Sequence, residues 1–128
     1  MLPLDGLKVV AIEQAVAAPF ASMRLADAGA HVTKVERPEG DFARGYDDVA
    51  AGQSSYFVWL NRGKVSVTLD LTSEKGKAAL GRLLETADVL IQNLKPGSLA
   101  RHHRAGRADQ RVDVRRDGRM ADRASVEP

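Results

Sequence analysis

The chain has 128 residues, of which 44% are hydrophobic, and this is enough for one modest domain with a core of its own. It contains no cysteine, which excludes disulfides, thiolate nucleophiles and cysteine-ligated metals. The 19 basic and 17 acidic side chains give a net charge of +2, and this whole excess lies after Arg101. No run approaches the roughly 20 apolar residues of a membrane span, and the N-terminus lacks the pattern of a signal peptide. We therefore expect a soluble cytoplasmic protein with no metal site.

The first forty residues have the pattern of a strand, a helix and a second strand. Residues 7–12 (LKVVAI) form a short, β-branched apolar run, which predicts a strand buried on both faces. In the segment that follows, Pro19 suits the first turn of a helix and Gly29 its end. Residues 31–36 (HVTKVE) predict the next strand. These elements are expected to form a βαβ unit of a parallel sheet.

Apolar periodicity is absent from residues 37–55, where proline and glycine indicate a loop. Arg44 in this loop could touch a substrate, but a solvated charge is the more economical interpretation. The aromatic residues Tyr56, Phe57 and Trp59 come next and are expected in the core.

The second half of the pattern again alternates strand and helix. Residues 64–71 (KVSVTLDL) alternate apolar and polar side chains with the period of a strand. Thr72 or Ser73 can cap a helix whose apolar residues recur at helical spacing over residues 79–87. The apolar run VLIQN after Asp88 predicts a last strand. The fold class expected is therefore α/β, with an open parallel sheet.

Residues 102–128 contain no Leu, Ile, Phe, Tyr or Trp. Such a segment cannot offset the loss of about 1 to 2 kcal/mol of backbone entropy per ordered residue, so we expect a disordered tail. It is open to three interpretations: a nucleic-acid-binding arm, an extension without function, or the product of a shifted reading frame. Seven arginines diluted by five acids, without lysine or stacking aromatics, disfavour the first. The abrupt boundary at Arg101 favours the third.

Two sets of residues suggest a nucleotide site. Small residues precede the first helix and Glu36 ends the second strand, which is the outline of a dinucleotide site, although the G-x-G-x-x-G fingerprint is missing. The cations Arg37, Arg62, Lys64 and Lys95 flank strands, so they are expected either to meet phosphates or to be solvated surface charges. A dinucleotide-dependent oxidoreductase thus remains an alternative.

Three motifs carry a closer resemblance. The segments VERPEGD, LNRGK followed by LDL, and ADVLIQNLKPG, in this order, resemble the amino-terminal part of the family III CoA-transferases, the group of formyl-CoA, carnitine and bile-acid CoA-transferases. The resemblance covers residues 4–101, so residues 1–101 are expected to be the N-terminal part of such a domain and residues 102–128 the tail. It looks closest to the branch acting on small dicarboxylic acyl-CoA esters.

This resemblance implies an incomplete Rossmann-like sheet that cradles coenzyme A (CoA), in proteins whose full-length chains form interlocked homodimers. They move CoA from an acyl-CoA thioester to a carboxylic acid acceptor, with CoA as substrate and no prosthetic group. An aspartate forms a mixed anhydride with the acyl group. No nucleic acid or membrane partner is implied.

Matched to the family, eight residues are expected to contact CoA: Val16, Ala17, Arg37, Leu60, Lys64, Asn93, Leu94 and Arg101. The three cations among them suit phosphates. Val16 stands where formyl-CoA transferase has glutamine, so its polar contact is missing.

No residue of the chain matches the nucleophilic aspartate, which in the family lies downstream of the matched segment. The tail aspartates are no substitutes, because a nucleophilic carboxylate needs a shaped, water-poor site; they are Asp109, Asp113, Asp117 and Asp122. We therefore expect a fragment that is inactive alone. The alternative is a CoA- or nucleotide-binding module without catalysis.

Overall fold

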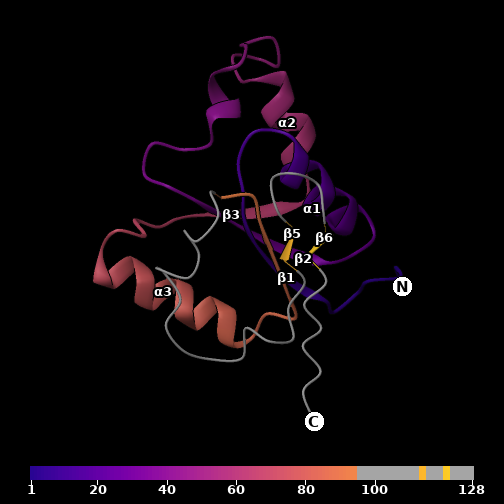
Figure 1. The fold of residues 1–128 in the computed structure, drawn as a ribbon. Coiled ribbons are helices and arrows are strands. Elements are labelled where there is room, and N and C mark those ends of the chain that lie inside the picture. Colours follow the sequence, from indigo (N-terminus) through magenta and orange to yellow (C-terminus); the bar gives the residue numbers. More distant parts are fainter. Residues whose placement is uncertain (95–112, 115–119, 122–128) are drawn as a thin grey trace.

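The computed structural model describes residues 1–94, 113–114 and 120–121. Four parallel strands form its sheet in the order β3-β2-β1-β4 (Figure 1). Their bounds are Lys8–Ile12 for β1, His31–Glu36 for β2, Lys64–Thr68 for β3 and Val89–Gln92 for β4. The predicted open parallel sheet of an α/β fold is thus confirmed. Because all four strands run the same way, their carboxyl ends meet at one edge of the sheet.

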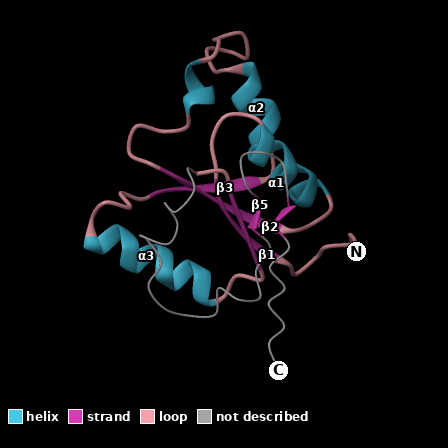
Figure 2. Ribbon diagram, viewed as in Figure 1, coloured by secondary structure: helices cyan, strands magenta, loops and turns pink. Residues whose placement is uncertain are grey.

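Helices cover both faces of this sheet. They are α1 (Ala17–Asp27), α2 (Ser55–Asn61) and α3 (Glu74–Glu85), with a short 3-10 turn, η1 (Phe42–Gly45), in the loop after β2. Helices α1 and α2 lie on one side of the strands and α3 lies on the other (Figures 1 and 2). Within the described part of the chain, no helix is long and apolar enough to cross a lipid bilayer.

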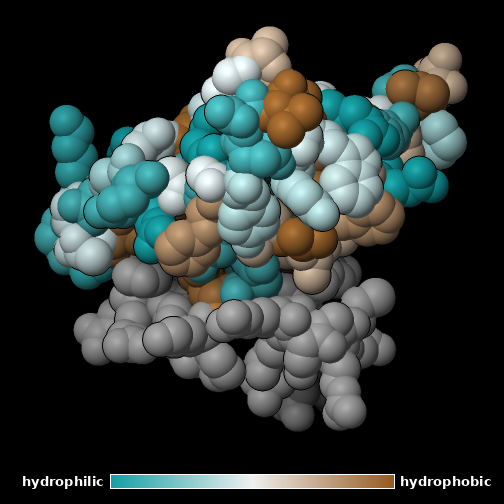
Figure 3. All heavy atoms as spheres, turned by 90° about the horizontal axis from the view of Figure 1, so that it is seen from above, coloured by the Kyte–Doolittle hydropathy of each residue, from teal (hydrophilic) through white to brown (hydrophobic). Residues whose placement is uncertain are grey.

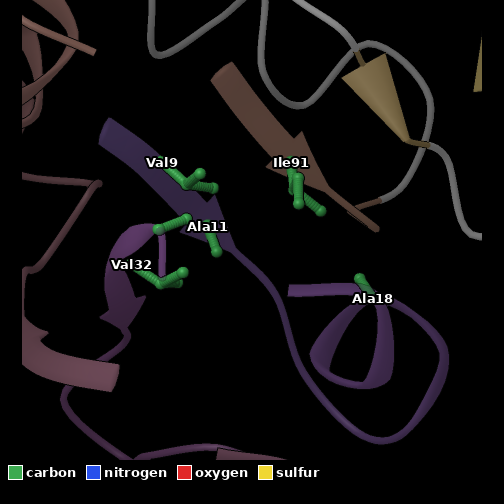
Figure 4. Packing of buried hydrophobic residues seen from close by; sticks show 6 residues of the cluster. Val9, Ala11, Ala18, Val32 and Ile91 are labelled. Carbon is green, nitrogen blue, oxygen red and sulfur yellow. The ribbon is translucent and has the colours of Figure 1, made fainter. Parts of the chain in front are cut away.

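The central strand β1 contributes to a core on each face of the sheet. Its alternate residues Val9 and Ala11 pack with Val32, Ile91 and Ala18 on the α1 side (Figure 4). The intervening residues, Val10 and Ile12, pack on the α3 side with Leu80 and Leu84. This burial explains why β1 has a continuous apolar sequence instead of an alternating one.

The helix ends follow the signals in the sequence. Pro19 lies in the first turn of α1, and Gly29 follows its end with a φ of 102°. A side chain at position 29 would lie 2.7 Å from the Cβ of Leu2, so glycine is required there for space as well as for φ. Helix α3 is capped by Ser73, whose Oγ accepts the Gly76 N–H at 3.0 Å. These predictions are confirmed.

Strand β3 is shorter than predicted. It ends at Thr68, although the alternating pattern continues to residue 71. The chain turns there because the Asp70 carboxylate accepts the Thr72 N–H at 2.9 Å, which favours a turn over an extended backbone.

The expected burial of Tyr56 and Trp59 is wrong. Both belong to the short helix α2, which the sequence did not reveal, and their side chains are 47% and 45% exposed. They stack edge to face with each other, Trp59 also with Phe20 and Tyr56 also with Tyr46. The chain thus presents a ridge of aromatic rings, and hydrophobic residues lie among hydrophilic ones on the face seen in Figure 3.

Most of the predicted tail lies outside the described residues. Within it, β5 (Asp113–Val114) pairs antiparallel with β6 (Met120–Ala121). The prediction of disorder for residues 102–128 therefore stays a prediction.

Candidate functional site

A cavity of about 450 Å³ opens at the carboxyl edge of the sheet. It is bounded by the ends of all four strands and the loops that follow them; its lining residues are Ile12, Glu13, Gln14, Val35, Arg37, Pro38, Glu39, Leu69, Asp70, Leu71, Thr72 and Leu94. The sequence order of the strands reverses between β1 and β4, which makes this edge the expected ligand site of an open α/β sheet. The size of the cavity is suited to a small molecule or to part of a nucleotide.

Arg37 is the cation in the wall of this cavity. Its Nε donates a hydrogen bond to the carbonyl oxygen of Gly40 at 3.1 Å, and its guanidinium lies 4.0 Å from the ring centroid of Phe42. The side chain is 44% exposed and lies 3.9 Å from the carboxylate of Glu39, a surface contact that contributes little. The guanidinium is therefore held in place while its other donors stay accessible to an anion.

Leu94 and Asn93 follow β4, and only Leu94 is a lining residue of the cavity. The side chain of Asn93 is turned to the neighbouring turn, where its Nδ2 donates to the carbonyl oxygen of Gln14 at 2.8 Å and its Oδ1 accepts the Gln14 N–H at 3.0 Å. The amide of Asn93 thus fixes the backbone beyond β1.

Val16 and Ala17 lie where β1 passes into α1. Val16 is the N-cap residue, and no side chain caps this end of the helix. Both residues are exposed, and they lie at the end of α1 where the helix dipole is positive. Phosphate groups bind readily at such helix ends.

Lys64 and Leu60 lie in the interior. Leu60 is fully buried in α2. The ammonium of Lys64 donates to Glu13 at 2.6 Å, to the carbonyl oxygen of Pro19 at 3.0 Å and to Asn61 at 3.0 Å, which satisfies its three protons. Burial lowers the pKa of Lys64, and the charge of Glu13 counteracts this. Lys64 is therefore engaged within the protein and does not line the cavity.

Lys64 belongs to a buried ion network on the α1 side of the sheet. Lys34 has a side chain that is 1% exposed; its ammonium lies 2.7 Å from Asp41 and 3.6 Å from Glu13. Ser22 of α1 donates to both carboxylate oxygens of Glu13. Two lysines and two carboxylates thus balance each other where water is excluded.

Glu36 forms a second cluster at the end of β2. Arg44 donates to both of its carboxylate oxygens, at 2.8 and 2.7 Å, and Ser66 and the Asp41 N–H donate as well. Burial raises the pKa of Glu36, but these hydrogen bonds prevail and hold it at about 2. A dinucleotide site would require this carboxylate to bind a ribose, but its oxygens already accept four hydrogen bonds from within the protein.

Arg44 is not the solvated loop charge that the sequence suggests. Besides its pair of bonds to Glu36, its guanidinium lies 3.8 Å from the ring centroid of Phe57. These contacts tie the loop after β2 to α2, and they raise the pKa of Arg44, chiefly through the hydrogen bond to Glu36.

Of the eight residues expected to contact CoA, the structure brings Arg37 and Leu94 together at the cavity. Asn93 lies directly behind it, and Arg101 lies outside the described residues. Arg62, also considered for phosphate, instead pairs with Asp27 at 2.6 Å. The expected CoA contacts of these residues stay predictions.

Sequence reasoning missed the roles of Lys34 and Asp41. A signal was present in β2, where Val32, Lys34 and Glu36 alternate onto one face and all three are buried. A charged residue at such a position needs a partner of opposite charge. The partner Asp41 lies in the loop beyond the strand, where the sequence shows no periodicity.

Comparison with known proteins identifies the family. The sequence profile of CoA-transferase family III matches residues 4–110. A probable fatty acyl-CoA transferase of Mycobacterium tuberculosis, Rv3272, is 46% identical over 100 residues, which cover 76% of this chain and 25% of the relative. The succinyl-CoA:mesaconate CoA-transferase of Haloarcula hispanica is 43% identical over 103 residues, covering 75% of this chain and 26% of the relative.

Solved structures agree with these relatives. The crystal structure of a CAIB/BAIF family protein from Brucella suis matches 89% of this chain with a TM-score of 0.79 and 39% identity, and the match covers 33% of that chain. The chain therefore spans about a quarter of the length of the curated relatives described above. The profile covers most of its sequence and the fold is that of a solved relative, so the chain belongs to the CoA-transferase family III.

Proposed function

We propose that this chain supplies the CoA-binding part of an enzyme that moves CoA from an acyl-CoA thioester to a carboxylic acid acceptor. The observation that carries the proposal is the cavity at the carboxyl edge of the sheet, with the half-exposed guanidinium of Arg37 in its wall. Family membership supplies the ligand class, and the cavity supplies a place for it.

In the proposed site, charged groups bind the phosphates of CoA and apolar groups contact the rest of the ligand. We propose that Arg37 and the N-terminus of α1, at Val16 and Ala17, bind phosphates of CoA. Leu94 contributes apolar surface for the adenine or the pantetheine arm. Leu60, Lys64 and Asn93 remain in the proposed set, although in the free chain Leu60 is buried and the polar groups of the other two are engaged with protein atoms. Arg101 remains in the proposed set.

The proposed chemistry needs a carboxylate nucleophile. Attack by an aspartate on the thioester forms an enzyme-bound mixed anhydride and releases CoA as thiolate. The thiolate then attacks the aspartyl carbonyl of the anhydride, which forms an enzyme–CoA thioester and frees the donor acid. The acceptor carboxylate attacks this enzyme–CoA thioester, and the returning thiolate takes the acceptor acyl group from the enzyme. In the described part of the chain, the buried carboxylates of Glu13, Glu36 and Asp41 are each held by a cation, so none of them is free to attack. The chain alone is therefore proposed to bind CoA without transferring it.

The proposed acyl groups are small dicarboxylic acids. A relative 43% identical to this chain is named for succinyl-CoA and mesaconate. A homodimer, which the family resemblance implies, and a cytoplasmic location, which the sequence suggests, belong to the same proposal.

Calorimetric titration of the purified chain with CoA tests the proposal, with Arg37→Ala as the informative variant. We expect wild-type binding, and a loss of about tenfold to a hundredfold in affinity for the variant, because a charge-assisted hydrogen bond contributes about 1.5 to 3 kcal/mol. Arg62→Ala is the matched control, since Arg62 pairs with Asp27 and does not line the cavity.

Three outcomes count against the proposal. One is a folded sample that gives no heat with CoA. Another is NAD binding that CoA cannot displace, which supports an oxidoreductase. The third concerns catalysis: turnover of succinyl-CoA and a labelled acceptor acid by the chain alone would contradict its role as a binding part only.

A further inference from the structure

The turn between β1 and α1 contains a residue in an unfavourable conformation. Ala15 has a φ of 66°, in the left-handed region that residues other than glycine rarely adopt. This conformation costs an alanine free energy that surrounding contacts must offset. Something in the structure therefore holds the turn in this shape.

Asp41 forms a hydrogen bond with the backbone of Ala15. Its Oδ1 accepts the N–H of Ala15 at 2.8 Å and that of Ala43 at 2.9 Å. Asp41 lies 26 residues further along the chain, in the loop after β2, so the bond links the ends of two neighbouring strands. Asn93 forms two further hydrogen bonds with this turn, one to the N–H and one to the carbonyl oxygen of Gln14, the residue before Ala15.

Asp41 is itself rigidly placed. Its side chain is fully buried, and its Oδ2 receives the ammonium of Lys34 at 2.7 Å. Its own N–H donates to the carboxylate of Glu36 at 2.9 Å. A hydrogen bond from a backbone N–H to a buried carboxylate is stronger than one to a neutral acceptor. Asp41 therefore transmits the geometry of the buried ion network to the backbone of Ala15.

We propose that Asp41 is a positioning residue for the CoA site: it holds Ala15 in the left-handed conformation and so sets the direction in which the backbone of Val16 and Ala17 meets the ligand. This inference rests on the proposed function. A turn that is shaped before the ligand arrives does not have to be ordered on binding, which raises affinity. Asp41 itself touches no ligand in this account.

Two substitutions test the role of Asp41. Asp41→Glu keeps the charge for Lys34 but moves the acceptor away from Ala15, and Asp41→Asn keeps the shape but removes the charge. We expect each folded variant to bind CoA about tenfold more weakly in calorimetry, because a turn that is no longer held in shape must be ordered when CoA binds. Adding Ala15→Gly to either variant should restore much of the affinity, because glycine adopts a positive φ freely.

A purely structural role gives a different result. In that case the variants would melt at a lower temperature, but their folded fraction would bind CoA as tightly as the wild type, and adding Ala15→Gly would not change the affinity. This result would overturn the inference. If Asp41→Asn does not fold, the CoA affinity of Asp41→Glu tests the inference. If neither variant folds, hydrogen exchange of the wild-type chain tests it. There, the Ala15 amide should exchange at least about tenfold more slowly than in an unstructured peptide, and unprotected exchange would refute the hold by Asp41.

The exchange measurement also separates this inference from the proposed function. A protected Ala15 amide that becomes exposed in Asp41→Glu, in a chain that does not bind CoA, would support the hydrogen bond from Ala15 to Asp41 but refute CoA binding, and with it the role of Asp41 at a CoA site. Unchanged CoA affinity in a folded Asp41→Glu variant would refute the positioning role and leave CoA binding intact.

Discussion

Replacing Lys34 with methionine should lower the free energy of unfolding by about 3 to 5 kcal/mol, the cost of leaving a buried charge without its partner. The ammonium of Lys34 lies 2.7 Å from Asp41 and 3.6 Å from Glu13, and all three side chains are excluded from water. Methionine fills the volume of the lysine stem but leaves two carboxylates to share the single charge of Lys64. Urea unfolding at neutral pH measures the difference.

Lys77→Met is the matched control. Lys77 pairs with Glu74 at 3.1 Å on the surface of α3, and the side chain of Glu74 is 92% exposed. The same substitution there should change the free energy of unfolding by no more than about 0.5 kcal/mol. Equal losses of unfolding free energy in the two variants would show that the ion pairs of Lys34 contribute no more to stability than a surface pair.

Gly76→Ala should destabilise the chain by about 2 kcal/mol or more, although alanine normally stabilises a helix by about 1 kcal/mol relative to glycine. A Cβ at position 76 would collide with the carbonyl group of Asp70, whose carbon would lie at 2.6 Å. That carbonyl cannot easily withdraw, because it accepts hydrogen bonds from both the N–H and the Oγ of Ser73. Steric overlap with backbone therefore outweighs helix propensity at this position.

A second glycine of the same helix tests the reasoning. A Cβ at Gly81 would meet no atom within 4 Å. Gly81→Ala should therefore raise the free energy of unfolding by up to about 1 kcal/mol, and thermal or urea unfolding of both variants gives the comparison. Changes of the same sign at the two positions would contradict the predicted clash.

The strands could be predicted because burial on both faces requires apolar runs, and such runs are visible without knowledge of the fold. This is why β1 and β4 were recognised. Pro19 and Gly29 were found near the ends of α1 because of their backbone preferences. Helix α2 was not predicted, because its seven residues are mainly aromatic or β-branched and lie partly in water. Its capping Ser54, which accepts the N–H of Phe57, was the available signal.

The site was less predictable than the sheet, because its charges are paired across long sequence separations. Lys64 was expected to face phosphate, yet its ammonium is bound by Glu13, 51 residues earlier. The sequence reveals that a cation is present, but not whether a carboxylate from another strand neutralises it. Arg37 was expected to flank a strand, and it does lie at the carboxyl edge, because it directly follows β2 and its position does not depend on long-range pairing.

Hydrogen exchange with and without CoA tests the central claim, that CoA binds at the carboxyl edge of the sheet, most directly. We predict slower exchange on adding CoA in residues 13–17, 37–41, 69–72 and 93–94, which follow the ends of the four strands, and little change in the exposed residues of α2. Protection confined to α2, or none in a folded sample, would contradict the account.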